Sequence, residues 1–330
     1  MTDVTPLVSI IIPFLDEEDY LPACLDSLLA QTYPAERIEV LAIDGGSRDG
    51  SRQVVGEYAS RDARIALYDN PRRNAAGGLN VGLERAAGEI VLRVDAHAAI
   101  APDYVARCVS LLQERPEIGN VGGPLRPVGE TLAGRAIALA LESPFSMGGS
   151  PFRYASAPCL VDTVYLGAYR RRDLARVGRF NDALHANEDY EFNYRLRRAG
   201  LHIWCDPAIR SRTYTRRTLT GLAWQYLRYG YWKARVALLW PRSLRARHLA
   251  APAFLLVVIL CAALRLWLPL GLLAGAYAAA NLSYTWRAGR RSGAAAAWLT
   301  PLVFAVMHTC WAAGFLAGLA PALASRLSRR

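Results

Sequence analysis

The chain has 330 residues and a formal net charge of +11, and 53% of its residues are hydrophobic. This length accommodates one large or two ordinary domains with a sizeable core. The six cysteines form no CxxC pair, so they indicate neither a zinc site nor a disulfide framework and fit a reducing cytoplasm. Met1–Pro6 is polar, and we expect no signal peptide.

The net charge is divided unevenly along the chain. All 28 acidic residues lie at or before Asp206, whereas residues 207–330 contain 17 basic residues and no acid. The first part, with 22 basic residues, therefore has a net charge of −6 and the second +17. Together with the long apolar runs of the second part, this asymmetry predicts contact with an anionic membrane surface. The basic part shows no recognisable nucleic-acid-binding fold, so we expect no nucleic-acid partner.

Short apolar runs alternate with helical patterns up to residue 205. The acids Asp16–Asp19 are expected to supply the cap and first turn of a helix that ends near Gln31. Alternating strands and helices predict an α/β fold with a mostly parallel sheet and right-handed crossovers. The predicted strands cover residues 7–14, 37–44, 64–68, 89–94, 118–122, 160–169 and 201–205, and later helices cover about 49–59, 74–87, 102–114, 132–141, a short stretch from 170, and 187–198.

The second part of the chain has the pattern of membrane-associated helices. Residues 218–240 are amphipathic and rich in Trp and Tyr, which predicts a helix in a membrane interface. Residues 249–284 are too long for one span and suit a tight hairpin that turns near 265–269. A basic loop at 286–293 and a further apolar run at 293–323 follow. Basic clusters at 242–247, 287–291 and 326–330 favour an even number of spans, and we expect three or four segments.

The apolar strand at 89–94 ends at Asp95, and His97 follows two residues later. Positions i and i+2 of an extended segment point the same way, and ligands bind at the carboxyl ends of strands in open α/β sheets. Asp95 and His97 are therefore candidate ligands of a divalent metal. The ordinary alternative is a capping aspartate beside a surface histidine.

Three further clusters of polar residues are candidates for chemistry. Asp44 ends the second strand before Gly45-Gly46-Ser47, where it would hydrogen-bond a base or ribose, or simply cap a turn. Arg72 and Arg73 precede the start of a helix, where they would lie near a diphosphate. The ordinary alternative is a loop with solvated arginines. Glu188-Asp189 opens a late helix, where acids are also favoured by the helix dipole.

The order of these motifs resembles the family 2 glycosyltransferases of the GT-A fold. Val8–Pro13 and Ile43–Gly50 resemble the nucleotide-binding start of that family, and Asp95-Ala96-His97 takes the place of its metal motif. Asn187-Glu188-Asp189 is similar to its catalytic Glu-Asp pair. Gln225-Tyr-Leu-Arg228-Tyr229 resembles the Gln-x-x-Arg-Trp signature of its membrane-bound polysaccharide branch. The resemblance covers about residues 7–235 and points to the branch typified by succinoglycan-biosynthesis glucosyltransferases.

The resemblance implies a role for each candidate residue. Asp189 would be the general base beside Glu188, and Asp95 and His97 would bind Mn²⁺ or Mg²⁺. His97 stands where the family usually has a second Asp, and Tyr229 where it has Trp. Mg²⁺ prefers oxygen ligands, whereas His suits Mn²⁺. The nucleotide sugar would contact Pro13, Asp16, Asp44, Ser47, Arg73, Asp95, Gln225, Arg228 and Tyr229.

The family further implies how the whole chain works. Residues 1–215 would form the cytoplasmic GT-A catalytic domain, 216–247 an interface helix with a basic linker, and 248–330 the segments of a multi-pass protein of the cytoplasmic membrane. The enzyme would transfer a sugar, with UDP-glucose as the expected donor, by inversion to a polyprenyl-diphosphate-linked saccharide in exopolysaccharide biosynthesis. The alternatives are a transferase that loads polyprenyl phosphate itself and a non-catalytic membrane protein that binds nucleotide sugars.

Overall fold

The structure, a computed structural model, describes residues 5–148, 150–292 and 294–327. Residues 1–4, in the stretch where we expect no signal peptide, and 328–330, in the last basic cluster, lie outside it. The chain divides into two units. The first comprises residues up to 126 and 151–213, and the second comprises 127–150 and 214 onward. The sequence-based division at residue 215 stays a prediction, and the second unit also takes in the segment 127–150.

An eight-stranded sheet organises the first unit, with strand order β3-β2-β1-β4-β9-β6-β10-β8. Strands β3, β2, β1 and β4 are parallel, β9 runs antiparallel to β4 and β6, and β8 runs antiparallel to β10. This mostly parallel sheet confirms the predicted fold class. The strands are β1 (Val8–Phe14), β2 (Ile38–Asp44), β3 (Ile65–Asp69), β4 (Ile90–Arg93), β6 (Ile118–Gly123), β8 (Cys159–Val161), β9 (Tyr165–Arg170) and β10 (His202–Cys205).

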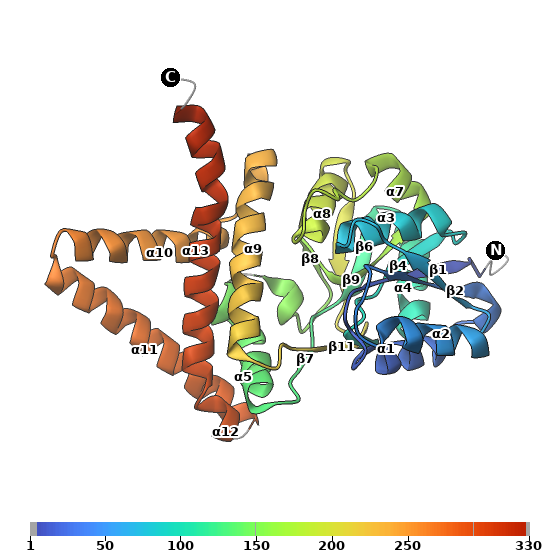
Figure 1. Ribbon diagram of the computed structural model, residues 1–330, viewed down its shortest axis with the longest axis horizontal. Helices are drawn as coiled ribbons and strands as arrows, with labels where there is room; N and C mark the ends of the chain where they lie inside the picture. The colour runs from blue at the N-terminus through green and yellow to red at the C-terminus, as the bar shows by residue number, and fades with distance from the viewer. Residues whose placement is uncertain (1–4, 149, 293, 328–330) are drawn as a thin grey trace. The chain divides into compact units, whose positions relative to one another are not determined.

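Helices cover both faces of this sheet (Figure 1). Because side chains alternate along a strand, Ile10 and Ile12 of β1 pack in one core and Ile11 in the other. Helices α1 (Leu21–Leu29), α2 (Ser51–Arg61) and α4 (Tyr104–Glu114) contribute to the first core. Helices α3 (Ala75–Arg85), α7 (Arg171–Val177) and α8 (Glu188–Arg198) contribute to the second.

Two details of the first unit differ from the sequence prediction. The predicted strand 160–169 is two strands, β8 and β9, since the chain leaves the sheet at Asp162–Val164 and the two pair with different neighbours. The strand pair β5 (Ala98–Ile100) and β11 (Ser211–Tyr214) was not predicted. Both strands are too short for a period of two to stand out.

The acids Asp16–Asp19 do not cap the first helix as expected. Helix α1 begins at Leu21, has Tyr20 at its N-cap and has no acid in its first turn. Asp16 has a φ of 55°, and its carboxylate accepts a hydrogen bond from the backbone of Arg48. The acids therefore connect the loop after β1 to the loop after β2.

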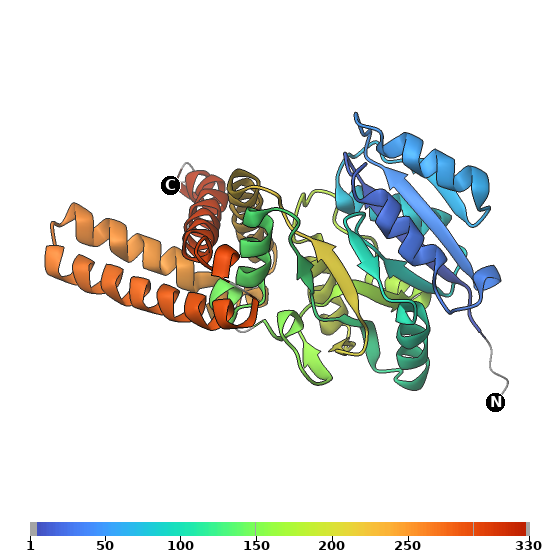
Figure 2. The same cartoon turned by 90° about the horizontal axis from the view of Figure 1, so that it is seen from below.

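The second unit is helical. Helix α9 packs alongside α13 in both views (Figures 1 and 2). A Cβ placed on Gly230 would lie 2.1 Å from the carbonyl oxygen of Trp311, and one on Gly314 would lie 2.0 Å from that of Leu227, so glycine allows the two backbones to touch. The helices are α5 (Leu132–Leu141), α6 (Pro144–Met147), α9 (Leu219–Leu239), α10 (Ala246–Ala263), α11 (Trp267–Ser292), α12 (Ala294–Ala297) and α13 (Thr300–Leu327).

The predicted helical hairpin is confirmed, because α10 ends at Ala263 and α11 begins at Trp267. The predicted basic loop at 286–293 is wrong, since α11 continues to Ser292. Arg287 and Arg290 lie over the rings of Tyr284 and Trp286, and cations are favoured in the last turns of a helix. Two helical segments, Ala246–Ala263 and Ala295–Ala320, are long and apolar enough to cross a membrane. The expected count of three or four spans stays a prediction.

Candidate active site

The carboxyl end of β2 holds Asp44 in a closed network. Its side chain is buried, and Oδ1 accepts hydrogen bonds from the backbone of Gly46 and Ser47 and from the Ser47 hydroxyl, at 3.0, 2.8 and 2.7 Å. Oδ2 lies 3.1 Å from the guanidinium of Arg52. Burial raises the pKa of Asp44, but the hydrogen bonds from Ser47, Arg52 and Gly46 outweigh it and lower the pKa overall. Asp44 is thus a fixed carboxylate at the sheet edge.

The loops beside Asp44 are joined by hydrogen bonds. The backbone N–H of Asp16 donates to Ser47 Oγ at 3.1 Å, and Asp16 Oδ1 accepts from the Arg48 N–H at 2.7 Å. Arg73, which has a φ of 55°, donates from its guanidinium to the carbonyl of Gly46 at 3.3 Å. Pro13 lies in β1, next to β2. The structure therefore brings Pro13, Asp16, Asp44, Ser47 and Arg73 into one region of the first unit.

A buried arginine connects the end of β4 to the start of α8. Arg93 Nε donates to Asp95 Oδ1 at 3.0 Å, and Nη1 lies 3.0 Å from Glu188 Oε1 as an ion pair. The side chain of Arg93 is only 14% exposed and that of Glu188 only 7%. A cation between two carboxylates compensates for the cost of burying them. Arg93 therefore holds Asp95 and Glu188 near each other.

Asp95 is ionised in this setting. Burial raises its pKa, but the charges of Arg93 and His97 and hydrogen bonds from Arg93 and Tyr165 lower the pKa overall. Glu188 differs, since burial raises its pKa, Arg93 opposes the rise, and the nearby charge of Asp189 adds to it. The two carboxylates on Arg93 are therefore shifted in opposite directions.

His97 Nδ1 lies 3.1 Å from Glu17 Oε1. A metal-binding histidine usually engages a carboxylate through its other ring nitrogen, so Nε2 is the nitrogen that would face a metal. Together with the Asp95 carboxylate, this donor set fits a divalent ion such as Mn²⁺. Among the described residues no three His, Cys, Asp or Glu side chains form a metal-binding group. A metal here would therefore take other ligands from the substrate, as Mg²⁺ and Mn²⁺ do at phosphate sites.

The start of α8 presents the second acid, Asp189. Asn187 precedes the helix with a left-handed φ of 61°, and Glu188 and Asp189 occupy the first turn. Asp189 is half-buried, and its Oδ1 accepts the Tyr190 N–H at 2.7 Å. Glu188 points into the protein toward Arg93, so Asp189 is the acid of the pair that is open to solvent.

The other three predicted residues, Gln225, Arg228 and Tyr229, lie on α9 in the second unit. The amide of Gln225 donates to the Tyr229 hydroxyl at 3.1 Å. Arg228 lies one turn from Gln225 on the same face, and its side chain is exposed.

Sequence reasoning missed Arg93, Glu17 and Tyr165 as members of the site. For Arg93 a signal was present, because a charged residue at the end of an apolar strand, two positions before Asp95, points the same way as Asp95. Glu17 and Tyr165 come from distant parts of the chain, and only the fold brings them to His97 and Asp95.

The strands β2, β1 and β4 are parallel neighbours, so Asp44 and Asp95 follow strands that end at the same edge of the sheet. This edge, with the acidic start of α8, has the architecture of a GT-A glycosyltransferase. Residues 9–177 match the sequence profile of the family described as "Glycosyl transferase family 2". The chain belongs to this family and is a glycosyltransferase.

Relatives extend the similarity over nearly the whole chain. The chain is 30% identical over 314 residues to "Succinoglycan biosynthesis protein ExoA" of Rhizobium meliloti, covering 93% of each protein. It is also 30% identical over 230 residues, 68% of this chain and 71% of the relative, to "Dolichyl N-acetyl-alpha-D-glucosaminyl phosphate 3-beta-D-2,3-diacetamido-2,3-dideoxy-beta-D-glucuronosyltransferase" of Methanococcus voltae.

A solved structure agrees with the fold. The "Mannosyltransferase PcManGT from Pyrobaculum calidifontis in complex with GDP-Man and Mn2+" superimposes with a TM-score of 0.62, covering 96% of this chain and 88% of that one at 22% identity. At this identity the likeness supports the fold, and the predicted family and fold are both confirmed.

Proposed function

We propose that the enzyme transfers a hexose from a nucleotide-diphosphate sugar, with UDP-glucose as the donor, to a lipid-linked saccharide during exopolysaccharide biosynthesis. The observation that supports this most is the link from Asp95 through Arg93 to the Glu188-Asp189 pair. This link joins the candidate metal-binding carboxylate, Asp95, and the pair that includes the candidate base in one charge network. The similarity to a succinoglycan biosynthesis protein over 93% of both chains supports the biosynthetic setting.

The donor would lie along the carboxyl edge of the sheet. Asp44 and Ser47 would hold the uracil or ribose side, with Pro13 and Asp16 beside them, and Arg73 would approach the diphosphate. Asp95 and His97 would bind Mn²⁺ or Mg²⁺, which when bound neutralises negative charge on the diphosphate leaving group. The mannosyltransferase that shares this fold was solved with GDP-Man and Mn²⁺, and a metal in this chain is proposed on that basis and on the donor set of Asp95 and His97.

Asp189 would act as the general base. It would take the proton of the acceptor hydroxyl while that oxygen attacks the anomeric carbon and the bond to the nucleoside diphosphate breaks. A single displacement of this kind inverts the configuration at the anomeric carbon. Glu188, held by Arg93, would orient the first turn of α8 and so place Asp189.

The acceptor would be carried on a polyprenyl diphosphate in the cytoplasmic membrane. Gln225, Arg228 and Tyr229 would lie on the acceptor side, and Tyr229 would stack on a sugar. The apolar helices of residues 248–330 would anchor a multi-pass protein whose catalytic domain, residues 1–215, faces the cytoplasm. The interface helix and basic linker, residues 216–247, would join the two.

Membranes that contain the enzyme, incubated with a panel of labelled nucleotide sugars, test this proposal. We expect one labelled sugar to enter the lipid extract only when a lipid-linked saccharide is present. Labelling of plain polyprenyl phosphate would instead identify the enzyme that loads the carrier. Binding of nucleotide sugars with no transfer to any lipid would indicate a non-catalytic protein.

A further inference from the structure

The second unit contains an open groove of about 600 Å³ between α9 and α13. The proposed transfer mechanism involves only Gln225 and Arg228 among the residues that line it. Its residues on α9 include pairs three or four positions apart, which are neighbours on a helix surface, and together they cover a broad part of that surface. Gly314 and Ala317 of α13 form the opposite side. The residues on the α9 side are Arg216, which precedes the helix, and Gly221, Trp224, Gln225, Leu227, Arg228, Tyr231 and Trp232.

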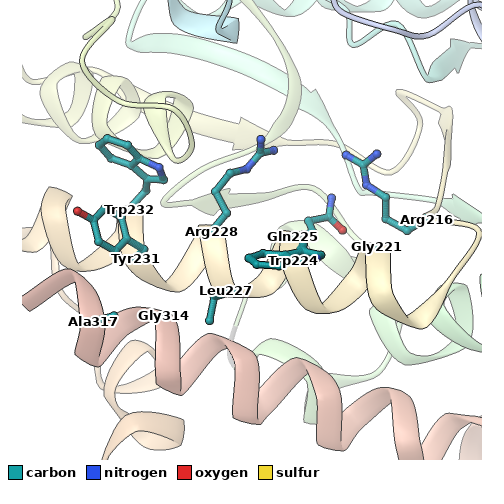
Figure 3. A pocket seen from close by; sticks show the side chains of 10 residues that line it. All are labelled: Arg216, Gly221, Trp224, Gln225, Leu227, Arg228, Tyr231, Trp232, Gly314 and Ala317. Carbon is teal, nitrogen blue, oxygen red and sulfur yellow. The ribbon is translucent and has the colours of Figure 1, made fainter.

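The groove has a charged edge and an apolar side. Figure 3 shows the guanidinium groups of Arg216 and Arg228 on the same side of α9, pointing away from α13, whereas Leu227 points toward α13. Trp224 is 68% exposed, and it lines the groove together with Leu227 and the two arginines. Exposed apolar surface rimmed by polar side chains is typical of ligand and membrane contact. Such a surface suits a molecule with an anionic head and a long apolar tail.

The charges around this groove favour an anion strongly. Within the described part of the chain, neither Arg216 nor Arg228 has an ion-pair partner. The chain carries no acidic residue after Asp206, so no carboxylate of α9 or α13 neutralises the two arginines. Guanidinium groups bind phosphate through charge-assisted, often bidentate, hydrogen bonds.

We propose that this groove binds the isoprenoid diphosphate portion of the acceptor. Arg216 and Arg228 hold the diphosphate, and the first isoprene units lie against Trp224, Leu227 and Tyr231 and over Ala317. This assignment rests on the lipid-linked acceptor of the proposed function. It adds where the carrier binds and which side chains recognise it.

Photolabelling of the full-length enzyme in detergent micelles tests the assignment. The probe is farnesyl diphosphate with a diazirine near the end of the isoprenoid chain that is remote from the diphosphate. We expect mass spectrometry to map the label to peptides that contain residues 221–232 and 311–318. Excess unlabelled farnesyl diphosphate should compete, whereas phosphatidylglycerol at the same concentration should not. Label confined to other peptides, or equal competition by phosphatidylglycerol, would overturn the proposal.

Two matched pairs of variants sharpen the result. Ala317→Leu fills the groove at an exposed position, and Ala313→Leu makes the same change at an exposed position one turn earlier that does not line it. Arg228→Gln removes a groove charge, and Arg242→Gln removes an exposed charge outside it. We expect each groove variant to lose about tenfold in probe affinity, the effect of one charge-assisted hydrogen bond or a blocked apolar contact. The controls should bind as the wild type does, and equal losses in both members of a pair would overturn the assignment.

Sugar transfer separates this inference from the proposed function. If wild-type enzyme labels a lipid-linked saccharide while Ala317→Leu retains full affinity for the probe, the groove assignment fails and the function stands. If wild-type enzyme labels no lipid at all, the proposed function fails and the groove loses its assigned ligand with it.

Discussion

The two units of this protein handle charge in opposite ways. The first buries Asp44 and Glu188 beside a mostly parallel sheet and pairs them with Arg52 and with the largely buried Arg93. The second leaves arginines such as Arg216, Arg228 and Arg242 exposed, and it also exposes large apolar side chains, of which Trp298 is 85% and Leu268 75% exposed. Its helices meet instead through small residues such as Gly230 and Gly314.

This contrast follows from the solvent that each unit suits. A charge buried in a folded protein is stable only when it is paired and hydrogen-bonded, and such fixed charges are what stabilise charge in a transition state. Helices in lipid gain little from burying apolar side chains and pack by close backbone contact. The first unit therefore suits the catalytic role proposed for it, and the second suits the proposed contact with a membrane.

Arg93→Met should produce the largest change among the variants that test this contrast. It leaves Asp95 and Glu188 buried without their cation, and removal of one member of a buried ion pair costs about 3–5 kcal/mol. We expect the urea midpoint of the first unit to fall and sugar transfer to be lost. Arg93→Lys, which keeps the charge, should recover part of both.

Arg64→Met is the matched control for Arg93. Arg64 pairs with Asp62 at 2.7 Å, and these side chains are 22% and 23% exposed. Because more water reaches this pair than the pair of Arg93 and Glu188, we expect its contribution to lie nearer the value of exposed pairs, at most about 1 kcal/mol. Equal losses of stability in the Arg64 and Arg93 variants would show that the buried network contributes no more to the free energy of unfolding than the pair of Arg64 and Asp62 does.

Gly230→Ala tests the close packing of the second unit. The added Cβ would lie 2.1 Å from a backbone oxygen of α13, and overpacking typically costs about 1–3 kcal/mol. We expect a lower melting temperature for the second unit in micelles, with nucleotide binding by the first unit unchanged. Gly275→Ala, where a Cβ meets nothing within 4 Å, is the control and should melt as the wild type does.

His97→Asp should change which metal supports activity. It replaces an imidazole by an oxygen ligand, which Mg²⁺ prefers. We expect the ratio of initial rates with Mg²⁺ and Mn²⁺ to rise by about tenfold, equivalent to ~1.4 kcal/mol. The exposed His202→Asp variant controls for the added charge. An unchanged ratio in the His97 variant would remove His97 from the metal site.

Asp44→Asn should have the smallest effect, and one that depends on pH. The pKa of Asp44 is lowered from 3.8 in the folded protein, so its contribution to stability is present above that pH and is lost as the pH falls through the folded value. The difference in urea midpoint between wild type and variant should therefore shrink below about pH 4.

Glu188→Gln should show the opposite pH dependence. The pKa of Glu188 is raised in the folded protein, so its contribution to stability is lost as the pH rises through the folded value.

Local patterns predicted most of the fold. The sequence predicts the strand before Asp95 and the helix at 132–141, and both are present. The sequence does not predict the extension of α11 through Arg287 and Arg290, because a run of charged residues favours a loop. The contacts of these arginines with aromatic rings are visible only in the structure. Short strands such as β5 depend on a partner about 110 residues away, and no local pattern reports such a partner.

The site was predicted less completely for a similar reason. Motif spacing predicts Asp44, Asp95 and Asp189 as candidates, because each lies at the end of a recognisable strand or opens a helix, and their roles stay predictions. It did not identify the pairing of Arg93 with Glu188 or of Glu17 with His97, because residues 80 or more positions apart meet only through the order of the strands.

Transfer by Asp189→Asn tests the central claim most directly. The measurement compares UDP binding and sugar transfer to the lipid fraction in the wild type and in this variant, which keeps the shape of the side chain and removes its basicity. We predict unchanged UDP affinity and a fall in transfer of about 10²–10⁴-fold, the usual contribution of a general base. Transfer at the wild-type rate in Asp189→Asn would contradict the account.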